Sequence, residues 1–215
     1  MVGAAYDILR RRILSNELPP GARFLEPELA QQLGMSRTPV REALIRLEAE
    51  DLVRIIPRRG IQIAPVTAQV MEEIYEIVTA LEAAAARRLA YTPTPARLAP
   101  LREALQRMDA ALEDGDLDAW GEADEAFHRA LITQAGNERL AATALRYRDQ
   151  VGRARTVTLR LRRELRKSNR AHWALLEAIA AGDSDRAGRL HRQQRDRATE
   201  ELLTILGKER NEAER

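Results

Sequence analysis

LPPGARFLEPELAQQLGMSRTPVREALIRLEAEDLVRIIPRRGIQIAP, residues 18–65, contains the signals of two short helices joined by a tight turn. Gly34 can adopt the left-handed conformation that ends a helix, and Ser36 is a good N-cap for the next one. Pro39 falls in the first turn of that second helix, where its missing N–H breaks no hydrogen bond. Two helices separated by so short a turn form a helix-turn-helix.

The outer face of the second helix carries basic side chains. Its apolar residues recur with the spacing of a helix face that packs on a core, and they are Val40, Ala43, Leu44 and Leu47. The opposite side presents Thr38, Arg41 and Ile45, with Arg37 at the exposed N-terminus. The first N–H groups and the helix dipole also attract anions there. This face is therefore suited to phosphate and base-edge contacts.

Two β-rich runs follow the helix-turn-helix. Residues 53–56 and 61–63 are rich in Val and Ile, and they flank the sequence PRRG at 57–60. We interpret them as a two-stranded wing with a basic tip, and the amphipathic residues 1–14 as a packed first helix. The prediction for residues 1–65 is therefore a winged helix-turn-helix domain of three helices and a two-stranded wing.

Helical periodicity replaces the strand pattern after Thr67. The first apolar face consists of Met71, Ile74, Val78, Leu81, Ala85 and Leu89, and Pro93 ends that helix. Further helical segments are 96–114, 117–135, 138–163, 168–181 and 184–206, and glycines between them suit helix ends. We predict a linker at 66–70, an antiparallel bundle of six or so helices at 71–207, and a disordered tail at 208–215.

Composition narrows the possible environment and partners. Hydrophobic residues make up 45% of the 215 and aromatic residues 4%, which favours a mainly α-helical chain. The absence of Cys excludes disulfides and thiolate metal sites, and no apolar run approaches the roughly 20 residues that span a bilayer. We expect a cytoplasmic protein that does not contact a membrane. The net charge of +2 decides little, because the basic signal is local.

All three histidines of the chain fall in the predicted bundle. Asp124 precedes His128 by four residues, so a helix places the carboxylate and the imidazole on one face, close enough to share a metal ion. His172 and His191 lie on later helices that can complete the set. Imidazole and carboxylate ligands suit Zn²⁺, Ni²⁺ or Mn²⁺. The alternative is an Asp–His hydrogen bond at the surface, which is the commoner meaning of this spacing.

The first third of the chain resembles the winged-helix head of GntR-type bacterial transcription regulators through PPG, EPELAQQLGMSRTPVREALIRLEAEDLV and PRRG. This resemblance implies a homodimer that places two recognition helices in successive major grooves of a palindromic operator, with the wing tip in a minor groove. The predicted DNA-binding residues are Ser36, Arg37, Thr38, Arg41, Arg46, Arg58, Arg59 and Gly60. Asp51 stands where the family usually has Gly, and we expect an intact wing because Asp tolerates a left-handed conformation.

EIYEIVTALEAAAARRLA, DEAFHRALITQAGNERL and AHWALLEAIAAGD resemble the helical FCD ligand-binding domain of the FadR subgroup. In its metal-binding members the ligands are one Asp and three His. Asp124, His128 and His172 match the first three. The fourth position falls on Gln194, while His191 lies one helical turn earlier, so either residue, or an open position, remains a candidate.

The effector pocket also departs from the family pattern. Val78 stands where the family usually has an arginine, and we place Val78, Arg153 and Trp173 in the pocket. The predicted function is a DNA-binding transcription regulator, most simply a repressor, controlled by a small metabolite. The alternatives are a metal-dependent hydrolase that uses Asp124, His128 and His172, and a non-specific architectural DNA binder.

Overall fold

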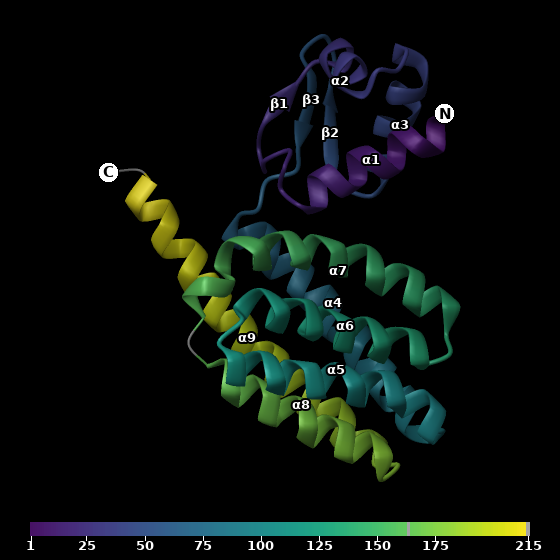
Figure 1. Ribbon diagram of the computed structural model, residues 1–215, viewed down its shortest axis with the longest axis vertical. Coiled ribbons are helices and arrows are strands. Elements are labelled where there is room, and N and C mark those ends of the chain that lie inside the picture. The colour runs from purple at the N-terminus through teal and green to yellow at the C-terminus, as the bar shows by residue number, and fades with distance from the viewer. Residues whose placement is uncertain (163, 214–215) are drawn as a thin grey trace. The chain divides into compact units, whose positions relative to one another are not determined.

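The computed structural model describes residues 1–162 and 164–213. The chain divides into two compact units, Met1–Val70 and Met71–Arg215 (Figure 1). Each unit has its own hydrophobic core. The architecture confirms the predicted winged helix-turn-helix followed by a helical bundle, with one correction to the sheet.

The first unit contains three helices and a small antiparallel sheet. The helices are α1 (Val2–Leu14), α2 (Glu26–Leu33) and α3 (Arg37–Ala49), and the strands are β1 (Arg23–Phe24), β2 (Val53–Ile56) and β3 (Gly60–Ile63). The strand order is β1-β3-β2, so the sheet has three strands where the sequence predicted two. Strand β1 was missed because two residues are too few to show an alternating pattern.

The turns of this unit match their sequence signals. Gly34 is left-handed with φ 62° and ends α2, and Ser36 is extended and precedes α3. Asp51 is left-handed with φ 57°, and β2 and β3 pair in register after it. The expected intact wing after Asp51 is therefore present.

Gly60 has a structural task in the sheet. Its φ is +87°, and a Cβ at this position would overlap the carbonyl oxygen of Phe24 on β1. Only glycine combines this backbone conformation with so close an approach of the neighbouring strand.

The second unit is a bundle of six described α-helices, as predicted (Figure 1). They are α4 (Ala68–Tyr91), α5 (Pro95–Asp114), α6 (Leu117–Gln134), α7 (Glu138–Thr158), α8 (Leu165–Ala180) and α9 (Ser184–Ala213), with a short 3₁₀ turn at Leu159–Leu161. Helix α5 packs against α6 and α8, and α8 packs against α9. Side chains of Thr94, Asp116 and Asn137 cap the N-termini of α5, α6 and α7.

Several helix boundaries differ from the prediction. Helix α4 begins at Ala68, inside the predicted linker, and α7 ends at Thr158, where the 3₁₀ turn takes over. Helix α9 runs to Ala213, through most of the predicted disordered tail, because Lys, Glu, Arg and Ala in this segment are good helix formers. Residues 214–215 lie outside the described residues.

Candidate DNA interface and metal centre

Helix α3 presents a polar face opposite a fully buried one. Arg37, Thr38 and Arg41 are exposed, whereas Val40 and Leu44 have no accessible surface. The buried stripe fixes the rotation of the helix, so the basic side chains point to solvent. The structure therefore places the three predicted contacts of the recognition helix on one accessible surface.

Arg46 lies on the flank of α3. Its guanidinium carbon is 4.4 Å from the ring centroid of Tyr6 on α1, and the Tyr6 hydroxyl donates to Glu50. This stacking fixes the Arg46 side chain against α1. Ser36 is exposed at the start of α3.

The wing tip consists of exposed basic residues. Arg58 and Arg59 are exposed, and Arg58 has the left-handed φ of 63°. Gly60 begins β3 and is half-buried beside Phe24. The close approach of β1 is sufficient to explain why this residue is a glycine. A DNA contact by Gly60 remains a prediction.

A buried cluster in the bundle joins Asp124 and His128 of α6 to His172 of α8. The Nε2 atoms of the two histidines are 3.3 Å apart. Asp124 Oδ1 lies 3.8 Å from Nε2 of His128 and 3.6 Å from Nε2 of His172. All three side chains are buried, and their ligand atoms lie within 4.8 Å of one another. The structure thus brings together the three residues predicted as metal ligands.

The outer nitrogens of both imidazoles face oxygen atoms. Nδ1 of His172 lies 2.9 Å from the Ser168 carbonyl oxygen, to which it can only donate, and this leaves the lone pair on Nε2. Nδ1 of His128 lies 3.2 Å from Oε2 of Glu82. Carbonyl and carboxylate partners of this kind orient metal-binding histidines in proteins. When Nδ1 of each ring carries the proton, the two Nε2 atoms and a carboxylate oxygen of Asp124 form a donor set within 4.8 Å, which fits a divalent cation.

Glu82 on α4 is a central residue that the sequence analysis missed. It has no accessible surface, and its Oε2 lies 3.0 Å from Nε2 of His191 and 3.8 Å from Nε of Arg195, while its Oε1 lies 3.5 Å from Nε of Arg148. A signal was present, because Glu82 continues the apolar stripe of α4, four residues after Val78. A carboxylate on such a stripe indicates a buried charge with partners.

The two candidates for the fourth ligand point to different places. His191 faces Glu82. Gln194 faces the cluster, and its Nε2 lies 2.7 Å from Nε2 of His172 and 2.9 Å from Nδ1 of the same ring. A second trio of Glu82, His128 and His191 is also close-packed, but two guanidinium groups already adjoin Glu82. A cation there would meet a guanidinium group at each oxygen of Glu82. At Asp124, Arg155 lies 3.9 Å from Oδ2, whereas Oδ1 faces the two imidazoles, so the Asp124 cluster is the better metal site.

The charge states of the cluster suit metal binding. Burial alone would raise the pKa of Glu82, but the charges of His128 and Arg148 hold that pKa well below its usual range. The pKa of Asp124 is likewise lowered against its burial, chiefly by His128. Burial lowers the pKa of His172 to about 3, which keeps this imidazole neutral near pH 7. Ionised carboxylates and a neutral imidazole are the forms that a metal requires.

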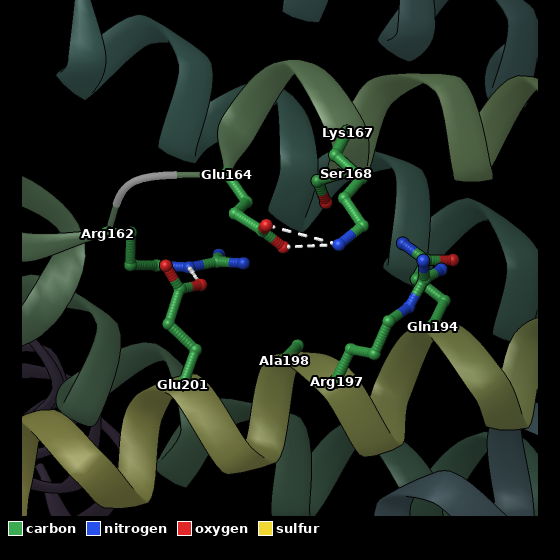
Figure 2. A pocket seen from close by; sticks show the side chains of 8 residues that line it. All are labelled: Arg162, Glu164, Lys167, Ser168, Gln194, Arg197, Ala198 and Glu201. Carbon is green, nitrogen blue, oxygen red and sulfur yellow. Dashed lines mark hydrogen bonds and ion pairs between the residues drawn. The ribbon is translucent and has the colours of Figure 1, made fainter.

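Two small cavities border the cluster. The first has a volume of about 20 Å³, and its lining includes Asp124 and four arginines, Arg148, Arg155, Arg162 and Arg195. The second, of about 30 Å³, lies between α8 and α9 and includes Gln194 (Figure 2). Arg162 lines both cavities, and its Nε lies 3.1 Å from Oε2 of Glu201. Each has room for one or two water molecules.

The residues predicted for the effector pocket do not line these cavities. Val78 is in the core, and the Trp173 indole donates to Asp109 over 2.8 Å. Arg153 is buried, and burial lowers its pKa to about 10. Arg155 lines the cavity beside Asp124. The sequence does not indicate which arginine lies beside the cluster, because this depends on how α7 packs against α6 and α9.

Each of the two units matches a known protein family. Residues 2–63 match the family model described as bacterial regulatory proteins, gntR family, and residues 73–196 match the FCD domain. An uncharacterized HTH-type transcriptional regulator from Agrobacterium vitis, in the TAR-I ttuE-ttuC' intergenic region, is 50% identical over 62% of this chain and 80% of its own length. One from Streptomyces ambofaciens, in an unstable DNA locus, is 33% identical over 83% of this chain and 75% of its length.

The solved structure of Escherichia coli McbR/YncC is also similar. It has a TM-score of 0.78 and 26% identity, with coverage of 95% of this chain and 97% of that one. The family models and the HTH-type relatives identify the chain as a transcription regulator rather than an enzyme. The chain belongs to the GntR family and carries an FCD domain. Among the described residues, no helix is long and apolar enough to cross a membrane.

Proposed function

We propose that this protein is a cytoplasmic, homodimeric repressor that binds a palindromic operator through residues 1–65 and senses an effector through residues 71–207. The observation that carries the proposal is the exposed face of α3, with Arg37, Thr38 and Arg41 over a fully buried apolar stripe. A two-fold dimer presents two such faces to half-sites about one helical turn apart. The remaining DNA contacts in this proposal are Ser36, Arg46, Arg58, Arg59 and Gly60.

A divalent metal, Zn²⁺, Ni²⁺ or Mn²⁺, is the proposed cofactor, held by Asp124, His128 and His172. The support is the convergence of two imidazole lone pairs and a carboxylate oxygen within 4.8 Å. The Ser168 carbonyl and Glu82 orient the two rings. The metal would supply a positive charge and open coordination positions to an oxygen of the effector.

The proposed effector is a small metabolite with an anionic group. The cavity beside Asp124 contains guanidinium groups, and Nη1 of Arg148 and Nη2 of Arg195 are buried with no hydrogen-bond partner among the described residues. Buried donors of this kind favour an acceptor such as a carboxylate. A ligand larger than a few atoms requires Arg162 and Ala198, which both cavities share, to move.

Effector control would act as a population shift between two arrangements of the heads. Glu82 ties the cluster to α4, and α4 begins at Ala68, directly after the predicted head. A ligand that favours one position of α4 thereby favours one spacing of the recognition helices, and only a matching spacing occupies both half-sites.

A genome-wide pull-down of bound DNA tests the proposed operator. We expect one palindromic motif to be enriched with the wild-type protein and lost with Arg41→Ala. Equal recovery of all fragments would indicate an architectural DNA binder instead. A reporter gene placed behind the recovered motif tests the sign of regulation, because a repressor lowers its transcription.

Metal analysis of protein purified without added metal tests the cofactor. We expect bound metal in the wild-type protein and its loss in His172→Ala. Equal metal content in the two proteins would remove this site.

A further inference from the structure

We propose that Gln194 is the fourth metal ligand, through its amide oxygen, and that this oxygen narrows the preference of the site for Zn²⁺ over Mn²⁺. The inference rests on the proposed metal centre of Asp124, His128 and His172. The resemblance to metal-binding FCD domains implies one aspartate and three histidines as ligands, and its fourth ligand position falls on Gln194. The inference concerns how this glutamine changes the metal preference of the site.

His191 is committed elsewhere. Its Nε2 lies 3.0 Å from Oε2 of Glu82, and neither side chain has accessible surface. The ring centroids of His191 and His128 are 6.1 Å apart. To reach the cluster, His191 would leave a buried carboxylate that depends on its N–H donors, which is a costly exchange. His191 therefore supports the cluster from outside, through the Glu82 side chain that also adjoins His128.

Gln194 is already placed at the cluster. It is 6% exposed, and its amide nitrogen lies 2.7 Å from Nε2 of His172. Its Oε1 is buried and has no hydrogen-bond partner among the described residues. Rotation about the last side-chain bond exchanges the two amide atoms and brings this oxygen beside the His172 ring, next to the other donors of the cluster. Figure 2 shows Gln194 on α9, among the residues that line the cavity between α8 and α9.

The resulting donor set contains two imidazole nitrogens and two oxygens. Nitrogen ligands favour Zn²⁺ and Ni²⁺, whereas carboxylate and carbonyl oxygens suit Mn²⁺. Zn²⁺ remains the tighter ion in any such site by the general order of divalent metals, so the expected effect is on the ratio of the two affinities. Mn²⁺ also prefers more ligands than four, which leaves positions for water or for oxygens of an effector.

The same geometry allows an opposite role for the amide. In the arrangement described, the Gln194 N–H can donate to Nε2 of His172, and this hydrogen bond occupies the lone pair that a metal needs. If that bond dominated, Gln194 would compete with the metal. The two roles predict opposite signs for Gln194→Ala: weaker metal binding if the amide is a ligand, and tighter binding if it competes.

The experiment measures the dissociation constants of Mn²⁺ and Zn²⁺ by chelator competition on the full-length, metal-stripped protein. The variants are Gln194→His and Gln194→Ala, and Gln193→Ala is the matched control because the neighbouring Gln193 is exposed on the same helix. We expect Gln194→His to raise the ratio of Zn²⁺ to Mn²⁺ affinity about tenfold or more, and Gln194→Ala to weaken both ions about tenfold. Gln193→Ala should leave both constants unchanged.

The other possible results distinguish an error in the role of Gln194 from an error in the metal centre itself. An unchanged ratio in Gln194→His, or tighter binding in Gln194→Ala, overturns the role of Gln194 while the three-residue metal site stands. If neither the wild-type protein nor Gln194→His binds either ion, the proposed metal centre itself is wrong. Circular dichroism of each variant separates loss of binding from loss of fold, and Gln194→His, which keeps a polar side chain, provides the test if Gln194→Ala does not fold.

Discussion

Nε2 of His191 lies 3.0 Å from Oε2 of Glu82, although 109 positions separate the two residues in sequence. Both side chains are completely buried, and Arg148 and Arg195 adjoin the same carboxylate. Glu82 is therefore the residue through which α4, α7 and α9 share one charged network. The same carboxylate lies 3.2 Å from the ring of His128, so the network also adjoins the candidate metal centre.

Replacing Glu82 tests this network. We expect Glu82→Gln to lower the free energy of unfolding by about 3–5 kcal/mol, because buried guanidinium groups lose their counter-charge while the shape of the side chain is kept. Urea denaturation followed by circular dichroism measures the change. Glu76→Gln, on the exposed face of the same helix, is the control and should change stability by less than about 0.5 kcal/mol. Similar losses in both variants would refute the network.

Acid should weaken the protein partly through Glu82. In the folded state, the charges of His128 and Arg148 hold the pKa of Glu82 well below its usual value of 4.5. The carboxylate therefore contributes stability that is fully present above about pH 4.5 and is lost as the pH falls toward the folded-state pKa. Between neutral pH and pH 3, the stability of Glu82→Gln should fall less steeply than that of the wild-type protein. Parallel pH profiles would show that Glu82 has no such linkage.

Metal binding should stabilise the helical domain. At a free metal concentration of one hundred times the dissociation constant, the expected gain is about 2.7 kcal/mol in the free energy of unfolding. Thermal denaturation with metal added, and again after addition of a chelator, measures it. The gain should disappear in His172→Ala. A metal-dependent gain of equal size in that variant would place the ion elsewhere.

The sheet of the head depends on a glycine beside β1. We expect Gly60→Ala to destabilise the head by at least about 1–3 kcal/mol, because the added Cβ meets the Phe24 carbonyl and the φ is positive. Gly3→Ala is the matched control, since Gly3 is helical and exposed and a Cβ there meets nothing within 4 Å. Gly3→Ala should be neutral or slightly stabilising. Equal thermal midpoints for the two variants would contradict the close approach of β1.

Local patterns in the sequence predicted most of the fold. Apolar periodicity, Gly34 and the capping residues placed the helices within a few residues, because these signals act over one or two helical turns. The left-handed conformation of Asp51 followed from the same local chemistry. Strand β1 did not follow, because its two residues are defined by pairing with β3 and not by a pattern of their own.

The candidate metal site was predictable only in part. Asp124 and His128 share one helix, so their spacing alone brings them together. The choice between Gln194 and His191 depends on Glu82, which lies far away in sequence and lines up with His191 only after α4 and α9 pack. The arginines beside Asp124 likewise come from two helices and a turn, and no single stretch of sequence indicates their convergence.

Operator discrimination is the direct test of DNA recognition by α3. Fluorescence anisotropy at fixed salt gives the affinities of the wild-type protein and of Arg41→Ala for the recovered operator and for scrambled DNA, with Arg107→Ala, an exposed arginine of α5, as control. We expect Arg41→Ala to lose about 1–3 kcal/mol of discrimination between the two DNAs, and Arg107→Ala to keep it. An unchanged ratio of the two affinities in Arg41→Ala would contradict the assignment of α3 as the recognition helix.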